Sequence, residues 1–339
     1  MRYPLLLVIA ALAGCKQDNV EELGPTDRAP TPFELTVPYY FPQLEIPQDN
    51  PLTREGIELG RRLYHDPTLS QNGPFEGFSC SRCHEQTSSF SVPTEGTAVL
   101  PHVNLAWSRN FLWTGKVVGT VEDIMRFEVE DFFEVDVSVL EEHPDYPELF
   151  RRAFGEGPIT EEMVAWALAQ WFRRLVSGNS KFDRYLLHTE ELTEAELRGM
   201  MIFQTETGDC FHCHGLPLMT DNAFHNIGLD SVYSGVNQGR ALITGNPSDM
   251  GAFKTPTLRN IALTAPYMHD GRFQTLEEVI DHYHTGVKPS ASLDPIMTKP
   301  GQVTVLLLDA QQKADLVAFL HTLTDLTFIT DTALSDPFD

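Results

Sequence analysis

The residues best suited to chemistry form two copies of one pattern, Cys-x-x-Cys-His, at positions 80–84 and 210–214. Two thiols at this spacing can form thioethers with the two vinyl groups of a haem, while the adjacent imidazole ligates its iron. The six residues that would hold the groups are Cys80, Cys83, His84, Cys210, Cys213 and His214. The repeated pattern therefore predicts two covalently bound c-type haems.

Two other uses of paired cysteines fit this sequence less well. A zinc site needs its two Cys-x-x-Cys pairs about 15–20 residues apart, whereas here the gap runs from Cys83 to Cys210. A redox disulfide requires neither the histidine that follows each pair nor a second copy of the pattern. Haem attachment is therefore favoured over both.

The size and charge of the chain limit the other possibilities. Its 339 residues exceed the ~100–200 of one typical domain, and the two patterns begin 130 positions apart (210 − 80), so each can have its own domain. The net charge of −24, from 24 basic and 48 acidic residues, would repel nucleic acid and favour basic partners. Four of the five cysteines belong to the patterns, so only Cys15 remains and no disulfide framework is expected.

The N-terminal residues are typical of an export signal. Residues 1–14 combine a basic start with an apolar run that is too short to span a bilayer as a helix. The sequence Leu12-Ala13-Gly14-Cys15 resembles a bacterial lipobox, which implies cleavage before Cys15 and a lipid anchor on its thiol. An ordinary secretory signal is the alternative. Lys16 resembles the residue at this position in outer-membrane lipoproteins of Gram-negative bacteria, so we expect the chain to face the periplasm from that membrane.

The stretches before the two cysteine patterns share one helical design. Apolar periodicity predicts a helix over residues 53–64 and another over residues 193–203, where Thr193 and Glu196 form a capping box. In each stretch a glycine precedes an aromatic residue by four positions: Gly60 before Tyr64, and Gly199 before Phe203. We expect the glycines to lie where each helix crosses another and the aromatic rings to face the haems. The repeat indicates a duplicated cytochrome c unit.

Further helices are expected, and strand signals are few and short. The predicted helices cover residues 121–127, 161–175, 276–284 and 310–323. The fold class is therefore mainly α, with two cytochrome c-like haem domains from an internal duplication and long loops around the haems. We expect these domains at residues 51–185 and 186–328, preceded by an extended, proline-rich tether over residues 15–50 whose early part is disordered.

Over residues 50–325 the chain resembles the bacterial di-haem cytochrome c peroxidase and MauG superfamily. The most specific stretch runs from Phe253 to Gly271, and shorter matching pieces are residues 104–107, 111–115, 182–185 and 275–279. The resemblance implies that the N-terminal haem, with His84 as its proximal ligand, meets peroxide. It also implies that the C-terminal haem, with His214, stores or relays an electron.

The resemblance implies residues for electron and proton transfer. Trp113 falls where the family has a tryptophan between the haems, from which an indole can shuttle electrons. In the segment after Trp113, one inserted residue places Glu134 at the family's acid/base glutamate and Ile124 at a nearby glutamine; without the insertion, Asp123 and Phe133 fall there. Heterolysis of peroxide needs a group that moves a proton from the near to the far oxygen. Six acids in this segment could do so.

The sixth ligand of the haem at His214 separates two subgroups of the family. In the resembling peroxidases a methionine lies fourteen residues after the histidine that matches His269, and here this position is Tyr283, as in MauG-like proteins. A phenolate is a hard anionic donor that favours ferric iron, whereas a thioether raises the reduction potential. Met268, 54 residues after His214, is the alternative ligand.

The family suggests two further sites. Members often hold a calcium ion between the domains through an asparagine side chain and main-chain carbonyls. Thr264 and Pro266 match the carbonyl positions, but the asparagine position is Ala98, so calcium binding is left open. His102, 18 residues after His84, could approach the first iron in an inactive state or serve as a hydrogen-bonded loop residue.

Together these features predict an oxidoreductase: a lipid-anchored di-haem c-type peroxidase that reduces hydrogen peroxide at the first haem. Its electrons would come from a small cytochrome or copper protein through the second haem. An alternative takes them from a side chain of a partner protein, such as a tryptophan, as MauG-like enzymes do. A third interpretation is a non-enzymatic electron-transfer or redox-sensing cytochrome. One high-spin ferric haem that reacts with peroxide would favour an enzyme, and two inert low-spin haems would favour the carrier.

Overall fold

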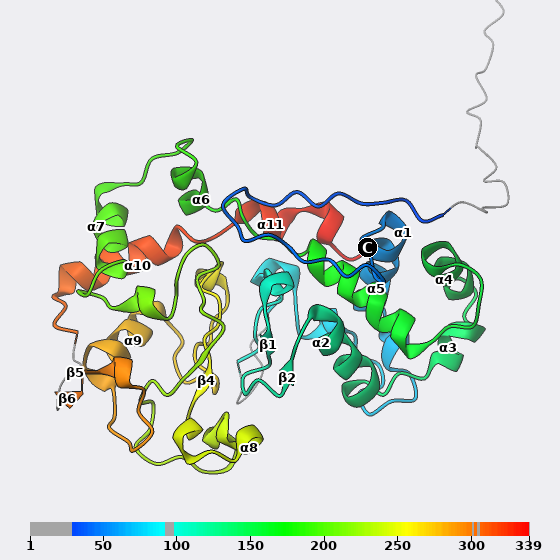
Figure 1. Ribbon diagram of the computed structural model, residues 1–339. Helices are drawn as coiled ribbons and strands as arrows, with labels where there is room; N and C mark the ends of the chain where they lie inside the picture. Colours follow the sequence, from blue (N-terminus) through cyan, green and yellow to red (C-terminus); the bar gives the residue numbers. More distant parts are fainter. Residues whose placement is uncertain (1–28, 92–97, 300–301, 304–305, 339) are drawn as a thin grey trace, which may run out of the picture.

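The computed structural model describes residues 29–91, 98–299, 302–303 and 306–338, and it places two helical lobes side by side (Figure 1). The predominance of helices confirms the mainly α fold class. The expected signal peptide, residues 1–14, and the expected anchor Cys15 lie outside the described residues. Within the described ranges, no helix combines the length and the apolar character needed to cross a membrane.

The first lobe is built around a pair of crossed helices. Its helices are α1 (Arg54–His65), α2 (Val121–Phe127), α3 (Val137–Glu142), α4 (Tyr146–Phe154) and α5 (Glu161–Arg174). Helix α1 crosses α5, α2 packs on α5, and α4 packs on α1. A π-helix, Glu128–Phe132, directly continues α2.

The second lobe repeats the crossed pair with different helices. These are α6 (Lys181–Leu186), α7 (Glu194–Phe203), α8 (Ala241–Thr244), α9 (Leu276–Asp281) and α10 (Ala310–His321). Helix α7 crosses α10, and α9 packs on α10. A second π-helix, His282–Gly286, continues α9. Helix α11 (Leu326–Thr330) then returns to the first lobe, where Phe328 and Leu334 join the core.

Strands are short and pair antiparallel. The pairs are β1 (Asn110–Phe111) with β2 (Val117–Val118), β3 (Phe224–His225) with β4 (Phe253–Lys254), and β5 (Thr298–Lys299) with β6 (Gln302–Val303). Most of the remaining chain forms loops and short 3-10 turns, as the sequence predicts.

The helices predicted from the sequence are confirmed, with small differences at their ends. The prediction for residues 276–284 corresponds to α9 and the start of the π-helix that follows it. The capping box of α7 is present: the Thr193 hydroxyl accepts from the Glu196 amide at 3.3 Å, and the Glu196 carboxylate accepts from the Thr193 amide at 2.7 Å. Each such cap satisfies amides that the first helical turn leaves without partners.

Both helix crossings depend on a glycine, as expected. A Cβ on Gly60 in α1 would lie 2.0 Å from the carbonyl oxygen of Ala167 in α5. A Cβ on Gly199 in α7 would lie 1.9 Å from the carbonyl oxygen of Asp315 in α10. The two helix pairs can therefore approach this closely only because these positions lack a side chain. The duplication itself and the domain boundary at residues 185 and 186 stay predictions.

Buried apolar residues form two separate cores, one in each lobe. The first extends from Leu59 to Leu175 and includes the residues contributed by the C-terminal segment. The second extends from Phe182 to Leu323.

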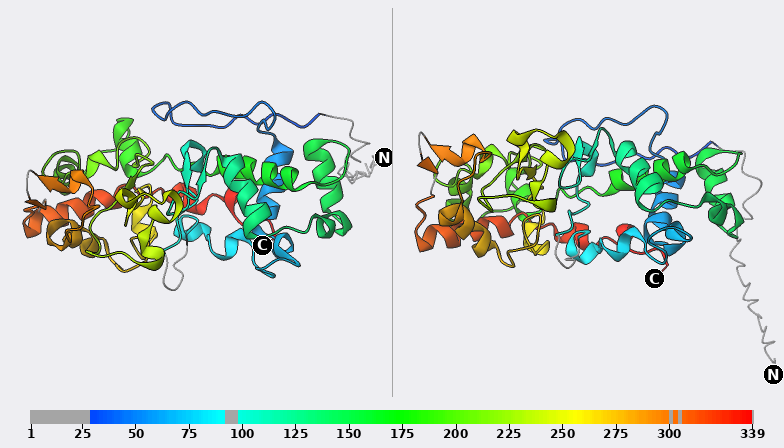
Figure 2. Two further views of the ribbon diagram at one scale, coloured as in Figure 1. Left: turned by 60° about the horizontal axis from the view of Figure 1, so that its bottom comes forward. Right: turned by 90° about the horizontal axis from the view of Figure 1, so that it is seen from below.

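The described part of the expected tether, residues 29–50, is extended but packs against the body of the protein, crossing both lobes (Figures 1 and 2). Near the first lobe, the Asn50 amide donates to Glu122 at 2.9 Å. Near the second, the Tyr40 hydroxyl donates to Asp183 in α6 at 2.7 Å. We call residues 29–50 the strap. These contacts involve residues far away in the sequence, so proline content alone did not reveal them.

The α1–α5 crossing can be tested by adding one methyl group. Gly60→Ala should lower the free energy of unfolding by about 1–3 kcal/mol, the typical cost of overpacking, because its Cβ would overlap the Ala167 carbonyl. Glu58→Ala on the exposed side of the same helix should change it by less than about 0.5 kcal/mol. Urea unfolding followed by circular dichroism measures both. Equal stability of Gly60→Ala and the wild type would contradict the close approach.

Candidate haem sites

The first cysteine pattern lies on a 3-10 helix, Cys80–Arg82, that packs against α1. His84 follows, and its Nδ1 is 2.9 Å from the carbonyl oxygen of Phe90. A carbonyl oxygen can only accept, so Nδ1 carries the proton and Nε2 keeps its lone pair. Haem-ligating and metal-ligating histidines are commonly oriented by this kind of bond.

The second pattern repeats this arrangement. It lies on a 3-10 helix, Cys210–His212, after α7, and Nδ1 of His214 is 3.1 Å from the carbonyl oxygen of Met219. Burial lowers the pKa of His84 and of His214 to about 4. Both imidazoles are therefore neutral near pH 7 and can offer Nε2 to iron. The residues at both patterns fit a covalently attached haem.

His102 supports the first ligand in this structure. Its ring stacks on that of His84, with ring centroids 3.5 Å apart and an angle of 14° between the planes. Its Nδ1 is 3.1 Å from the hydroxyl of Tyr64 in α1. The His102 ring therefore lies directly beside the proximal ligand of the first site.

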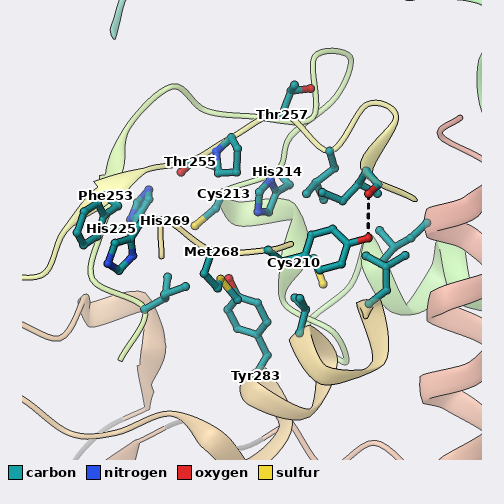
Figure 3. A pocket seen from close by; sticks show the side chains of 18 of the residues that line it. Cys210, Cys213, His214, His225, Phe253, Thr255, Thr257, Met268, His269 and Tyr283 are labelled. Carbon is teal, nitrogen blue, oxygen red and sulfur yellow. Dashed lines mark hydrogen bonds between the residues drawn. The ribbon is translucent and has the colours of Figure 1, made fainter. Parts of the chain in front are cut away.

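A largely apolar cavity lies beside the second pattern (Figure 3). Its apolar walls include Phe203 from α7, Ile280 from α9, and Leu316 and Leu320 from α10. Cys210, Cys213 and His214 also line it. An apolar slot with two thiols and a neutral imidazole has the donor set that a c-type haem needs.

Both candidates for the sixth ligand line this same cavity. The side chains of Tyr283 and Met268 point into the space that His214 lines (Figure 3). Tyr283 belongs to the π-helix His282–Gly286, and such one-turn widenings are frequent at functional sites. The structure thus brings both candidates to the cavity.

Burial raises the pKa of Tyr283, with smaller contributions from Cys213 and Cys210. The free phenol is therefore neutral at pH 7. A bound ferric ion reverses this preference, because its positive charge stabilises the phenolate.

Trp113 lies where the two lobes meet. It is in the turn between β1 and β2 of the first lobe, yet it lines the cavity of the second. Its Nε1 donates to the Ala98 carbonyl at 2.7 Å, and its own carbonyl accepts from the Lys254 amide in β4 at 2.9 Å. Arg240 of the second lobe donates to the carbonyl of Gly115 at 2.9 Å and so holds the same turn. The indole is thus held by the first lobe through Ala98, and the backbone of its turn is held by the second lobe.

The residues expected to move protons lie near the π-helix Glu128–Phe132. Glu134, which follows it, has an exposed side chain and a φ of 49°. Ile124, at the glutamine position, is buried. Sequence reasoning did not single out Glu128, which is half-buried and acts electrostatically on Cys80. Helical spacing could have found it, because Glu128 lies four residues after Ile124 on the buried face.

His225 is a second residue that the sequence did not reveal. It lines the cavity of the second haem, with Nε2 2.8 Å from Asp221 and Nδ1 2.7 Å from Asp294. Hydrogen bonds to Asp221, Asp294 and Cys213 raise the pKa of His225 to about 12, so the imidazole is charged. The two carboxylates stand 73 positions apart in the chain (294 − 221), so no local pattern marked the cluster.

The expected calcium ligands also lie at this cavity. Thr264, Pro266 and Ala98 line its wall. Ala98 has no side-chain oxygen, and the Thr264 hydroxyl donates to the Ile261 carbonyl at 3.2 Å. Calcium binding stays an open prediction.

Comparison with known proteins assigns the family. A family model described as di-haem cytochrome c peroxidase matches residues 54–191. The methylamine utilization protein MauG of Methylorubrum extorquens is 37% identical over 295 residues, which cover 82% of this chain and 80% of that protein. The chain belongs to the di-haem cytochrome c peroxidase family. As a member, it is an oxidoreductase with two covalently bound c-type haems.

The other relatives of this di-haem protein include some named as peroxidases and some named as MauG-like. The cytochrome c551 peroxidase of Nitrosomonas europaea is 32% identical over 249 residues, covering 68% of this chain and 73% of that protein. A crystal structure of a MauG-like protein associated with microbial copper homeostasis is 33% identical, with a TM-score of 0.81, covering 91% of this chain and all of that chain. The diheme peroxidase BthA of Burkholderia thailandensis, 20% identical with a TM-score of 0.63 over 85% of this chain and 91% of its own, shares the fold.

The number of haems attached to the protein can be determined from its mass. Protein produced with a c-type maturation system should carry two haems, and Cys210→Ala combined with Cys213→Ala should carry one, because a thioether needs its thiol. Mass spectrometry of the denatured protein measures both. Two haems retained in the double variant would contradict attachment at the second pattern.

Proposed function

We propose that the protein reduces hydrogen peroxide at the haem held by His84, with electrons that arrive from the haem held by His214 by way of Trp113. The observation that carries this proposal is the arrangement of these three side chains. Each histidine has its Nδ1 proton bound to a carbonyl and is neutral, and Trp113 lines the cavity of the second haem while its turn is bound to both lobes. The bound haems would supply the iron and the redox equivalents. The peroxidases among the relatives support this reaction.

The reaction requires protons as well as electrons. Reduction of one H2O2 to two water molecules consumes two electrons and two protons. The protein must therefore place a proton-transfer group at the first site and a route for electrons at the second. The two lobes divide these tasks: the carboxylates that follow α2 belong to the first lobe, and the cavity with Tyr283 belongs to the second.

A second candidate function is oxidation of a side chain, such as a tryptophan, of a partner protein. One observation favours it: Tyr283, which is not a thioether, points into the cavity of the second haem. A phenolate stabilises oxidised iron, so it suits a protein that holds oxidising equivalents at both haems better than one that keeps an electron in reserve. The MauG relatives support this alternative.

An optical spectrum tests whether either reaction is feasible. We expect one high-spin ferric haem, whose spectrum changes when hydrogen peroxide is added, and one low-spin haem. Steady-state assays with a small cytochrome and with a copper protein as donors would then separate the two functions. Fast turnover with either donor supports peroxide reduction. Two low-spin haems inert to peroxide would contradict both proposals.

The ligand at the second haem can be tested by two substitutions at one cavity. Tyr283→Phe should change the low-spin ferric spectrum and raise the reduction potential of that haem, because an anionic donor to ferric iron is lost. Met268→Leu, which alters the same cavity, should leave both properties nearly unchanged. Spectroelectrochemistry measures them. The reverse pattern would establish methionine ligation and favour the ordinary peroxidase.

We also propose that the protein is exported and held at the periplasmic side of the outer membrane by a lipid on Cys15. The apolar run before Cys15 and the small residues Ala13 and Gly14 support this. An anchored enzyme would meet its peroxide and its redox partner in the periplasm. The net charge of −24 favours a partner with a basic surface.

The anchor makes a separate prediction. Cys15→Ala should move the protein from the membrane fraction to the soluble fraction while both haems are retained, because Cys15 belongs to neither haem pattern. Fractionation followed by haem staining checks this. A variant that stays in the membrane fraction would contradict lipidation of Cys15.

A further inference from the structure

Tyr64, near the end of α1, carries a buried phenol that the proposed reaction does not use. Its side chain is fully buried, and its ring packs against those of Trp171 and Phe172 in α5, with ring centroids 6.0 and 5.7 Å apart. Burial raises the pKa of Tyr64, so the hydroxyl keeps its proton in the resting protein. A buried tyrosine hydroxyl usually has a hydrogen-bond partner, and here the partners belong to the first haem site.

The hydroxyl of Tyr64 reaches the first haem ligand at two points. Its oxygen is 3.2 Å from the carbonyl oxygen of His84 and 3.1 Å from Nδ1 of His102. The His102 ring in turn stacks on the His84 ring, with centroids 3.5 Å apart. Tyr64 is therefore connected to the proximal ligand through its backbone and through a stack of rings in contact. Both are short routes for an electron.

The second lobe provides an internal comparison. Tyr64 follows Gly60 by four positions in α1, and Phe203 follows Gly199 by four positions in α7. Phe203 is buried and lines the cavity of the second haem without a hydroxyl. An aromatic ring is thus sufficient for packing at this position of the shared helical design. The additional oxygen of Tyr64 occurs in the lobe proposed to meet peroxide, and a phenol is far easier to oxidise than a phenyl ring.

Oxidation of a phenol needs a base, because the phenol becomes a strong acid when it loses an electron. Nδ1 of His102 lies within hydrogen-bond distance of the Tyr64 hydroxyl and can take this proton. Trp171 differs, since its buried Nε1 has no hydrogen-bond partner among the described residues. A Trp171 that lost an electron would keep its proton and stay a radical cation, whereas Tyr64 can become a neutral radical. The oxidising equivalent therefore settles on Tyr64.

We propose that Tyr64 is a reserve electron donor to the haem held by His84, used when the second haem does not deliver an electron. The inference rests on the proposed function, in which hydrogen peroxide is the oxidant. Tyr64 gives one of the two electrons that reduce H2O2 to two water molecules, and the haem groups give the other. The two protons that complete the water molecules come from the solvent.

The proton of Tyr64 stays inside the protein. Its O–H bond breaks as the proton moves to Nδ1 of His102, whose own ring proton is on Nε2, and a neutral tyrosyl radical remains. Because the ring is fully buried, the radical is kept from solvent and from other proteins. A later electron from the second haem, together with the proton held by His102, restores Tyr64.

The test uses the full di-haem protein and two variants. Tyr64→Phe removes the phenol and leaves an aromatic ring of the kind that the second lobe has at the matching position. Tyr146→Phe is the matched control. Tyr146 is also buried in the first lobe, and its hydroxyl donates to Asp66 at 2.7 Å, but among the described residues it has no hydrogen bond or ring contact with His84 or His102. Two bound haems and an unchanged ferric spectrum confirm that each variant is folded.

The measurement is electron paramagnetic resonance of ferric protein that is mixed with hydrogen peroxide without a donor and then rapidly frozen. The wild type should give a radical signal that narrows when ring-deuterated tyrosine is incorporated. The signal should be lost in Tyr64→Phe and keep its full yield in Tyr146→Phe. Reduction of the second haem before mixing should lower the yield, because an electron from that haem replaces the one from Tyr64.

The outcomes separate this inference from the function on which it rests. If the optical spectrum of the wild type responds to peroxide but no radical forms, or the signal ignores the tyrosine label, the inference is overturned and the peroxide reaction stands. An undiminished signal in Tyr64→Phe would overturn it as well, and loss in Tyr146→Phe alone would assign the radical to Tyr146. A wild-type spectrum that does not respond to peroxide would overturn the proposed function, and this inference with it.

Discussion

The guanidinium of Arg259 and the carboxylate of Asp183 form a buried pair through two hydrogen bonds of 2.9 and 3.0 Å. Arg259 lies in the stretch most specific to the family, and Asp183 begins the second lobe in α6. The same guanidinium donates to the carbonyl of Pro217, in the loop just after His214, and lies over the ring of Phe41 in the strap. Removing one partner of such a pair costs about 3–5 kcal/mol, because the other charge stays buried. The loop that orients the second haem ligand thus depends on this pair.

The surroundings of His84 and His214 prepare both imidazoles to ligate iron. Each histidine would be a poor iron ligand if it were free to rotate or to gain a second proton. The carbonyl of Phe90 or of Met219 fixes the ring and its tautomer, and burial keeps it neutral. The two sites then diverge: the second is lined by Tyr283 and the charged His225, while the half-buried Glu128 acts electrostatically on Cys80 of the first. Similar ligands in unlike surroundings allow two haems in one chain to do different work.

Local features of the fold were visible in the sequence. The cysteine patterns and the capping box of α7 involve residues within a few positions of one another, where spacing alone fixes the geometry. The two crossing glycines were visible from their common spacing to the aromatic residue that follows, although their packing partners lie on distant helices. The position of Tyr283 and Met268 at one cavity also followed from counting along a stretch resembling a known family. These parts need no knowledge of the tertiary structure.

Other features depend on residues far apart in the chain, and no local pattern encodes them. The path of the strap is set by partners such as Glu122 and Asp183. The burial of Glu128 depends on how α2 packs on α5, so composition could not separate it from five other acids. The charge on His225 needs two aspartates brought together by the fold. Tertiary packing therefore decided which of several equivalent residues became functional candidates.

The strap has a mechanical consequence. It crosses both lobes, the turn that carries Trp113 is held by Arg240 of the second lobe, and α11 returns the end of the chain to the first. A hinge motion that separated the lobes would have to break all three connections at once. Contacts of the strap, of Arg240 and of the C-terminal segment thus all oppose separation of the lobes that carry the two haem sites.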